Sequence, residues 1–262
     1  TKGLVRNTDT STDYYKIQHA IDNASAGDTL HVWAWTYYET LDVDRRVTIM
    51  GNGTGNTTID GESSSDDVVY ITKDDVTIKS LKIVNGASYS IWTVYDDIEI
   101  DNVIVHNSGN WGIYASSSER LTISNSIISS SSNGGIYTYN SATIKNSNII
   151  DNNYYGIYIA GTQNNIENST VSGTTCSGSC SINGDGIYIF GNSAFIYNNT
   201  ISNNSNNGIY ADGSSSSRYI SNKVVDNDAH GLILDYNWGG NSGLVLHNQI
   251  LRNEKSGLCL SY

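Results

Sequence analysis

The sequence predicts an all-β fold: a right-handed, single-stranded parallel β-helix of about nine coils with an N-terminal capping helix. A short motif recurs roughly every 22 residues through most of the chain, which is a typical period for a solenoid repeat. A second strand-like element lies between its copies, and no segment between the two elements has helical periodicity. Short strands without crossover helices are typical of a β-helix in which each repeat forms one coil.

The first element is Gly-Ile-Tyr. It occurs at 112–114, 135–137, 156–158, 186–188 and 208–210, with degenerate copies at 231–233 and 257–259. Side chains alternate along a strand, so if the isoleucine points inward the tyrosine points outward. Coils stacked about 4.8 Å apart then place equivalent residues in columns along the rod.

The second element is a strand with the pattern apolar-x-apolar-x-Asn-x-x-apolar. An inward Asn at a tight turn can bond to its equivalents in neighbouring coils and satisfy backbone groups that the bend leaves unpaired. We therefore expect a structural ladder of these amides: Asn102, Asn125, Asn146, Asn168, Asn198, Asn222 and Asn248.

We expect one domain over residues 1–262, with the cap helix and first strand in 1–30 and the coils in 31–262. Apolar residues at helical spacing predict a helix over Tyr15–Ala24, with Asp13 as its N-cap. A helix before the first coil would cover a sheet edge that is otherwise exposed. The chain ends in strand register, so we expect another copy or a further part of a longer protein to cover the last coil.

The composition excludes some partners. The chain has 14 basic and 26 acidic residues, a net charge of −12, which argues against DNA, RNA and other anionic partners. No apolar run approaches the roughly 18 residues of a membrane span. The sequence begins without a basic and apolar leader, has 3 cysteines and contains several Asn-x-Ser/Thr triplets. These features favour an extracellular or cell-surface location.

Two kinds of covalent modification are predicted. The candidate glycosylation sites are Asn23, Asn52, Asn56 and Asn203. Cys176 and Cys180 flank Ser-Gly-Ser inside the longest repeat, and a disulfide between them would pin this loop in an exported protein. Cys259 is then unpaired, and it is expected either to be buried against a partner or to bridge two chains.

Outward aromatic residues form the most extended candidate surface. The chain has 19 tyrosines against 2 phenylalanines, as expected if half-exposed rings need a wet hydroxyl. Two interpretations remain open: a contact face for a glycan or for lateral association, and a stack that stabilises the sheet. The column comprises Tyr70, Trp92, Tyr114, Tyr137, Tyr158, Tyr188 and Tyr210.

A charged cluster supplies the candidate catalytic residues. Lys79, Glu99 and Asp101 fall on strands of neighbouring coils, where clustered carboxylates can supply an acid and a base or bind Ca²⁺. The alternative is a solvated charge ladder on the surface of the rod. The five histidines show no two-His metal spacing, so we expect no metal cofactor apart from possible calcium.

The opening of the chain resembles pectin-lyase-like β-helix proteins, and within these the NosD-like, carbohydrate-binding and sugar-hydrolase repeat group that is abundant among archaeal cell-surface proteins. The residues that carry the resemblance are 15–24, 26–32, 36–39, 47–49, 51–53 and 58–61. The resemblance implies the β-helix fold over the whole chain. It implies no single activity, because the group includes lyases, epimerases, esterases and surface proteins.

The chain departs from its enzymatic relatives. It lacks the Asp-Pro-His of alginate epimerases and the Gly-His-Gly with Arg-Ile-Lys of polygalacturonases, and it has Ala34-Trp35 where relatives carry Pro-Gly. The first hypothesis is therefore a non-catalytic structural or adhesive protein that assembles end to end. The alternatives are a polysaccharide lyase, epimerase or hydrolase with its cleft beside Asp101, and a glycan-binding module. The expected partners are a polysaccharide or glycan, or other copies of the chain.

Overall fold

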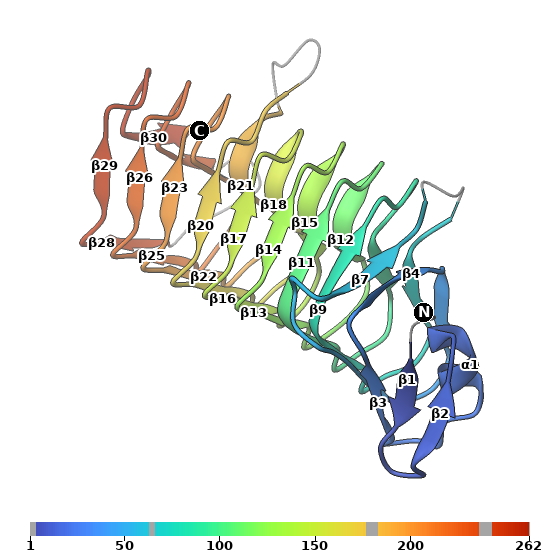
Figure 1. The fold of residues 1–262 in the computed structure, drawn as a ribbon. Coiled ribbons are helices and arrows are strands. Elements are labelled where there is room, and N and C mark those ends of the chain that lie inside the picture. The colour runs from blue at the N-terminus through green and yellow to red at the C-terminus, as the bar shows by residue number, and fades with distance from the viewer. Residues whose placement is uncertain (1–3, 63–65, 177–182, 236–242, 262) are drawn as a thin grey trace.

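The structure is a computed structural model that describes residues 4–62, 66–176, 183–235 and 243–261. The chain winds into a rod of stacked coils, with its two ends at opposite ends of the rod (Figure 1). Nearly all neighbouring strands pair in parallel, each with its equivalent one coil away. The predicted all-β parallel solenoid is thus confirmed. Among the described residues, no helix is long and apolar enough to cross a membrane.

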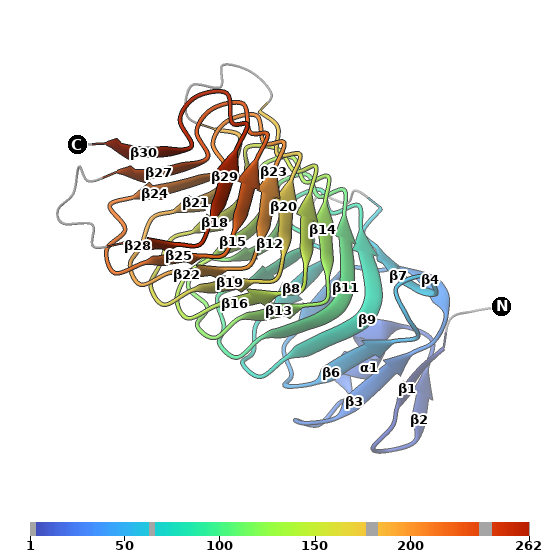
Figure 2. The ribbon, with the colours of Figure 1, turned by 90° about the vertical axis from the view of Figure 1, so that its left-hand side faces the viewer.

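Sheet B has ten strands along one side of the rod (Figure 2). They are β5 (Leu41–Val43), β8 (Val69–Ile71), β10 (Ile91–Thr93), β12 (Trp111–Ala115), β15 (Gly134–Thr138), β18 (Tyr155–Ile159), β21 (Asp185–Ile189), β24 (Ile209–Asp212), β27 (Leu232–Asp235) and β30 (Leu258–Ser261).

Sheet A has twenty strands and closes the rest of the coil in two rows. The first row is β3 (Thr29–Val32), β6 (Thr48–Gly51), β9 (Thr77–Val84), β11 (Glu99–His106), β13 (Thr122–Ser124), β16 (Thr143–Lys145), β19 (Asn165–Glu167), β22 (Phe195–Tyr197), β25 (Arg218–Ile220) and β28 (Leu244–Leu246). The second is β4 (Trp35–Tyr38), β7 (Thr57–Asp60), the later halves of β9 and β11, β14 (Ile127–Ser129), β17 (Asn148–Ile150), β20 (Thr170–Ser172), β23 (Thr200–Ser202), β26 (Lys223–Val225) and β29 (Gln249–Leu251).

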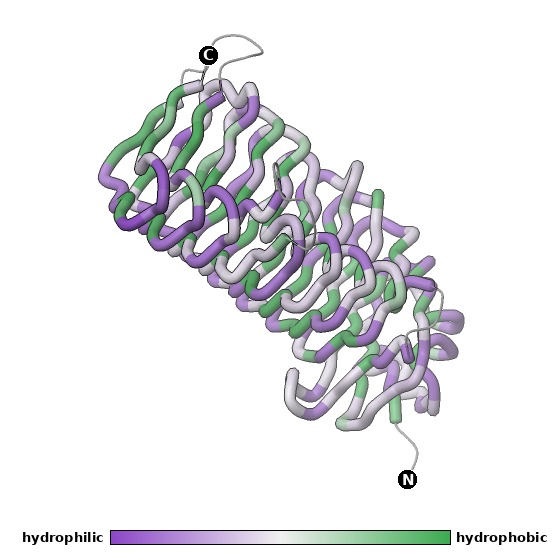
Figure 3. The backbone as a smooth tube through the Cα atoms, turned by 90° about the horizontal axis from the view of Figure 1, so that it is seen from above, coloured by the Kyte–Doolittle hydropathy of each residue, from purple (hydrophilic) through white to green (hydrophobic). Residues whose placement is uncertain are grey.

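The core is a set of inward apolar columns, one from each row of strands. Ile113, Ile136 and Ile157 of sheet B are fully buried and stand in register, and the isoleucines of sheet A stack in the same way. Hydrophobic segments therefore recur at the same place in successive coils (Figure 3). Each Ile or Val is buried against its equivalents above and below, which is how a solenoid builds one continuous core from small repeats.

The N-terminal end differs from the prediction in its details. The helix α1 spans Ile17–Asp22, shorter than expected, and buries Ile17 and Ala20. Asp13 is not its N-cap, because it lies in β2 (Thr12–Tyr14), which pairs antiparallel with β1 (Val5–Asn7). The carboxylate of Glu39 instead accepts hydrogen bonds from the N–H groups of Ile17 and Gln18 at 3.1 and 3.2 Å. A side chain distant in sequence thus satisfies the helix terminus.

The predicted inward asparagine ladder is wrong for five of its seven members. Asn102, Asn125, Asn146, Asn168 and Asn198 have φ of 50–52° and are exposed. A single left-handed residue turns the corner between the two rows of sheet A, and Asn adopts this conformation at low cost. The inward side chain belongs to the next residue, so only Asn222 and Asn248 of the predicted set point into the rod. The equivalents of the five in those later coils are the half-buried Ser221 and the exposed His247, also at positive φ.

The actual buried ladder starts as serine and continues as asparagine. Backbone N–H groups donate to the side-chain oxygen one coil further on: Ser169 N to Asn199 Oδ1 at 2.9 Å, Asn199 N to Asn222 Oδ1 at 3.0 Å and Asn222 N to Asn248 Oδ1 at 2.8 Å. A second buried ladder, which the sequence analysis did not predict, comprises Asn152, Asn204, Asn227 and Asn253. Both satisfy buried backbone groups at corners of the coil.

Candidate active site

The outward face of sheet B carries the predicted aromatic column, from Tyr70 on β8 to Tyr210 on β24. Strand pairing places each ring beside the next, as the alternation predicts. Ring centroids are 4.7 Å apart for Tyr114 and Tyr137, 5.1 Å for Tyr137 and Tyr158, and 4.8 Å for Tyr158 and Tyr188. From Tyr114 to Tyr210 the rings form a continuous strip whose spacing follows the rise of the coil.

A second column on the same face consists of the residues that precede the glycine of each repeat, and we call it the pre-glycine column. Its members are Trp111, Gly134, Tyr155, Asp185, Asn207 and His230. Trp111 is only 6% exposed, because its ring lies over Gly134 and meets Tyr137 edge-on with centroids 5.5 Å apart. The first half of the column thus consists of two aromatic residues and a glycine, and the second half consists of polar residues.

A third column lies at the ends of the strands, either as the last strand residue or as the residue after it. We call it the turn column, and its members are Tyr139, Ala160, Phe190, Asp212 and Asp235. The Tyr188 hydroxyl donates to Asp212 Oδ2 at 2.7 Å, and the Tyr210 hydroxyl donates to Asp235 Oδ2 at 2.8 Å. Burial and these carboxylates raise the pKa of both tyrosines above the ordinary value of 10.0. Both side chains are therefore neutral hydrogen-bond donors at neutral pH.

Asp185 is the most unusual acid of the face. It is fully buried, and its Oδ1 accepts from the N–H and the Nδ2 of Asn207 at 3.0 and 2.9 Å. Its Oδ2 has no hydrogen-bond partner among the described residues. Burial raises the pKa of this carboxyl to about 7, while the bonds from Asn207 lower it in part. A carboxyl that changes charge near neutral pH is a common component of catalytic sites.

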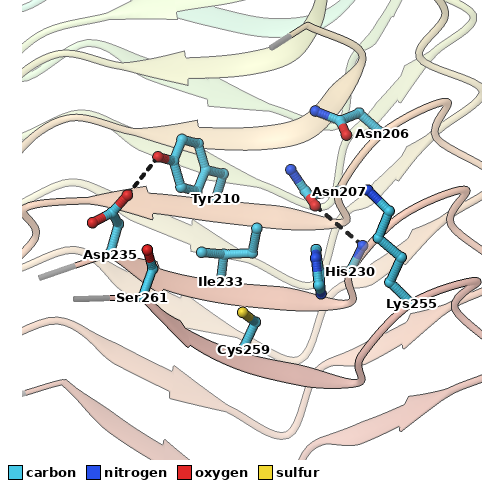
Figure 4. Close-up of a pocket in the computed structure, with 9 residues that line it drawn as sticks. All are labelled: Asn206, Asn207, Tyr210, His230, Ile233, Asp235, Lys255, Cys259 and Ser261. Carbon is cyan, nitrogen blue, oxygen red and sulfur yellow. Dashed lines mark hydrogen bonds between the residues drawn. The ribbon is translucent and has the colours of Figure 1, made fainter. Parts of the chain in front are cut away.

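A pocket of about 330 Å³ opens where the aromatic column ends. Beyond Tyr210 the column continues with Ile233 and Cys259, and these smaller side chains leave a hollow below the tyrosine ring (Figure 4). His230 and Lys255 lie on one side of Ile233, and Asp235 lies on the other (Figure 4). An imidazole, an ammonium group and a carboxylate thus face one hollow from two sides.

Hydrogen bonds fix the orientation of His230. Its backbone N–H donates to Asn207 Oδ1 at 3.1 Å, which links it to Asp185 through Asn207. The N–H of Ser256 donates to its Nδ1 at 3.2 Å, so the proton of the neutral ring resides on Nε2. Burial, and the nearby charge of Lys255, lower the pKa of His230 below 6.5. At neutral pH the ring is therefore a neutral Nε2–H donor.

The catalytic candidates from the sequence lie elsewhere. Lys79, Glu99 and Asp101 belong to β9 and β11 of sheet A, where Lys79 pairs with Asp101. Asp101 Oδ1 accepts from Ser124 Oγ and Asn125 Nδ2, both at 2.7 Å. None of the three lines the pockets along the face of sheet B. Asp101 orders the corner of a coil, which fits the charge-ladder interpretation better than catalysis.

Asn23, Asn52, Asn56 and Asn203 are all exposed, so each is accessible, and glycosylation there stays a prediction. The predicted Cys176–Cys180 disulfide lies outside the described residues because Cys180 falls within 177–182. Cys259 is a free thiol that lines the pocket. Within the described ranges, no group of three or more His, Cys, Asp or Glu side chains is arranged to hold a metal ion, and calcium stays a prediction.

Asp185, Asp212, Asp235 and Lys255 were not identified from the sequence, and His230 was noticed only as part of the repeat. The repeat itself contains the missing signal. Aligning the copies of Gly-Ile-Tyr and inspecting the residue before Gly and the second residue after Tyr gives the two flanking columns directly. Polar substitutions cluster in their later members.

Comparison with known proteins agrees with this fold. The family described as "right handed beta helix region" matches residues 67–180 and 138–262. The chain belongs to this family. The right-handed sense of the solenoid and the resemblance to pectin-lyase-like β-helix proteins are thereby confirmed. A search of curated protein sequences found no match.

Solved structures with the same fold share little sequence with the chain. The A-module of the Azotobacter vinelandii mannuronan C-5 epimerase AlgE6 has a TM-score of 0.78 at 16% identity, with 93% of this chain and 74% of that chain covered. An alginate lyase from Paenibacillus sp. str. FPU-7 has a TM-score of 0.68 at 17% identity, covering 94% and 96%. Pectate lyase Pel9A has 0.60 at 13%, covering 91% and 72%.

Proposed function

We propose that the chain is a polysaccharide-active enzyme that binds an extended glycan along the outward face of sheet B and acts on it in the pocket over Ile233. The observation that carries this proposal is the change along one face from stacked aromatic rings to a hollow flanked by His230, Lys255 and Asp235. A flat aromatic strip suits the apolar faces of sugar rings, and an acid and a base across a hollow suit proton transfer.

The comparisons support this hypothesis over the structural or adhesive role that the sequence analysis placed first. The similar solved structures include an epimerase and lyases that are named for polysaccharides, and this is consistent with a glycan partner. Self-assembly has no support from either the comparisons or the described residues. We include an extracellular location in the proposal, as the exposed Asn-x-Ser/Thr sites suggest.

The charges of the pocket favour a sugar that carries a carboxylate. Although the chain has a net charge of −12, Lys255 and the Nε2–H of His230 lie on one side of the hollow. Epimerisation and β-elimination both begin with removal of the proton beside the sugar carboxylate, and the charge that develops needs cations or hydrogen-bond donors. In our proposal Asp235 accepts that proton, and Lys255 with His230 stabilises the charge.

The hydrogen bond from Tyr210 supports this division of roles. Because the hydroxyl donates to Oδ2 of Asp235, the carboxylate is held in a fixed orientation. Asn207 accepts from the backbone N–H of His230 and donates to the buried Asp185, so the backbone that carries the imidazole is held in place. Positions held in this way lower the reorganisation needed during reaction.

The test is turnover of polymannuronate, polyguluronate, polygalacturonate and a neutral glucan, followed by the anomeric signals in NMR spectra and by the ultraviolet absorbance of unsaturated products. We expect turnover of a uronate polymer that falls by roughly 10²-fold or more in Asp235→Asn and in His230→Ala. The matched control is Asp101→Asn on sheet A, which should leave the rate unchanged. Absence of turnover on every polymer would overturn the proposal.

A glycan-binding module without catalysis is the second candidate. The observation in its favour is that one oxygen of Asp235 and Nδ1 of His230 already have hydrogen-bond partners in the protein. Binding of a uronate oligosaccharide without turnover, weakened by Tyr158→Ala on the aromatic column, would establish this alternative.

A further inference from the structure

A second hollow, of about 600 Å³, lies beside the face of sheet B, over the turns that follow β15, β18, β21 and β24. Its outward residues are four successive members of the turn column: Tyr139, Ala160, Phe190 and Asp212. The backbone equivalence is direct, because Ala160 N donates to Thr138 O and Phe190 N donates to Ile159 O, each at the end of a neighbouring strand. We call this hollow the turn groove.

The turn groove has aromatic walls and a bare backbone floor. Tyr139 is 38% exposed and Phe190 is 52% exposed, and Ala160 stands between them. Tyr139 and Phe190 form the two walls and lie two coil spacings, about 10 Å, apart. Because the residue between them is Ala160 and has no ring, there is space between the walls for one flat ring. The floor is Gly161 and Gly191, where a Cβ would overlap the backbone of the coil below. Side chains therefore cannot fill this space from beneath.

The solvent exposure of Phe190 is stronger evidence for a binding site than the exposure of a tyrosine would be. The chain has only 2 phenylalanines, and this one has no hydroxyl to bond to water. A wide apolar ring beside a hollow that is lined by glycine and alanine is the arrangement of a binding site rather than of a solvated turn.

The rim of the groove supplies oriented polar groups. Asn140 Oδ1 accepts from Thr162 N at 2.8 Å, and Asn192 Oδ1 accepts from Ser215 N at 2.8 Å. These bonds fix both amides by their oxygens, so each Nδ2 is directed to the surface as a donor. Asp212 is oriented by the Tyr188 hydroxyl through Oδ2, which leaves Oδ1 as an acceptor at the edge of the groove.

We propose that the turn groove is a second glycan site, separate from the pocket over Ile233, and that it binds one unit of a neutral glycan between Tyr139 and Phe190. The apolar faces of a pyranose ring fit the aromatic walls, and its hydroxyls fit amide donors and a carboxylate acceptor. Among the described residues that line the groove there is no Lys, Arg or His, whereas Asp212 is one of them, so a uronate would meet a like charge there. The class of ligand follows the proposed function, but binding here requires no turnover.

The test is isothermal titration calorimetry with neutral cellohexaose and mannohexaose and with charged hexamannuronate. We expect a neutral oligosaccharide to bind the wild-type chain and to lose roughly tenfold in affinity in Phe190→Ala. Ala160→Tyr should abolish this binding while keeping the fold, because the new ring completes the stack between Tyr139 and Phe190. The matched control is Tyr197→Ala, which removes a 37% exposed ring from sheet A and should change nothing.

Several outcomes separate the two proposals. Loss of neutral-sugar binding in Ala160→Tyr with uronate turnover retained supports two independent sites. Neutral binding without any turnover supports the turn groove and overturns the proposed enzyme. The turn groove is overturned if neither neutral hexasaccharide binds, or if Phe190→Ala and Ala160→Tyr bind it as tightly as the wild-type chain.

Discussion

The two halves of the sheet B face share one backbone and differ in side chains. In β12, β15 and β18 the pre-glycine column holds Trp111, Gly134 and Tyr155, and the rings of Trp111 and Tyr155 pack against the aromatic column. In the coils of β21, β24 and β27 the same column holds Asp185, Asn207 and His230, and the turn column changes from Tyr139 to Asp212 and Asp235. Strand register is constant throughout, so the repeat builds the scaffold and its deviations build the candidate site.

The comparison of the two halves shows which departures from the repeat indicate a functional site. The aromatic half stabilises the rod through stacked rings, each pair worth about 1 kcal/mol beyond the area it buries. The polar half instead contains a buried carboxyl, which costs stability when it is charged. A position where the residue departs from the repeat and lowers the stability of the fold is a better indicator of function than a position that follows the repeat.

The largest effect is expected at Asp185 in the polar half. Its pKa of about 7 in the folded chain lies above the ordinary value of 3.8, so the folded state holds the proton more tightly. This contribution to stability is complete below about pH 4 and is lost as the pH rises to about 7. At roughly 1.36 kcal/mol per pKa unit the loss reaches about 4 kcal/mol. The titratable neighbour Tyr155, whose pKa is raised to about 12, stays neutral in this range.

Asp185→Asn should remove that dependence, because the amide has the shape of the protonated acid and cannot ionise. Urea unfolding at pH 4, 6 and 8 should therefore show a variant that is more stable than wild type only at the higher pH. The exposed Asp228→Asn is the control. Parallel stability profiles for the Asp185 variant and the wild-type chain would show that the carboxyl does not hold its proton as we infer.

A smaller effect is expected at Gly134 in the aromatic half. A Cβ at this position would overlap the Trp111 ring, so Gly134→Ala should cost about 1–3 kcal/mol and push the indole toward solvent. Unfolding and the emission wavelength of tryptophan measure the two effects. The control is the Trp111→Ala background, in which Gly134→Ala should cost little because the ring is gone. An equal cost in both backgrounds would place the strain in the backbone instead.

Much of the fold could be predicted from the sequence because a solenoid repeats its information. The inward Ile113 and outward Tyr114 follow from alternation alone, and the strand pairing places them as expected. The corner is where this logic fails. One left-handed residue shifts the alternation by one position, so Asn125 lies outside and Ser126 lies inside. Sequence pattern gives the type of residue at a corner, but the backbone conformation decides which side chain is buried.

The candidate site could not be predicted in the same way, because the residues that line the pocket come from different columns and from three successive coils, those of β24, β27 and β30. Lys79 and Asp101 are charged residues at equivalent positions of neighbouring repeats, which made them candidates. They lie on sheet A, however, and do not line the pocket. Ile233 is significant only because it follows Tyr210 in register and is smaller than a ring. A hollow is a difference in volume between neighbouring coils, and no single motif records it.

The smallest expected effect is the loss of one tyrosine hydroxyl, compared between the polar half and the aromatic half of the sheet B face. Tyr210 donates to Asp235, so Tyr210→Phe removes a charge-assisted hydrogen bond and should cost about 1–2 kcal/mol. The hydroxyl of Tyr137, in the aromatic half, has no hydrogen-bond partner among the described residues, so Tyr137→Phe should change stability by less than about 0.5 kcal/mol. Thermal unfolding of the two variants measures the difference. Equal losses would mean that ring stacking alone accounts for both tyrosines, and Asp235 would then need another group to orient it for proton transfer.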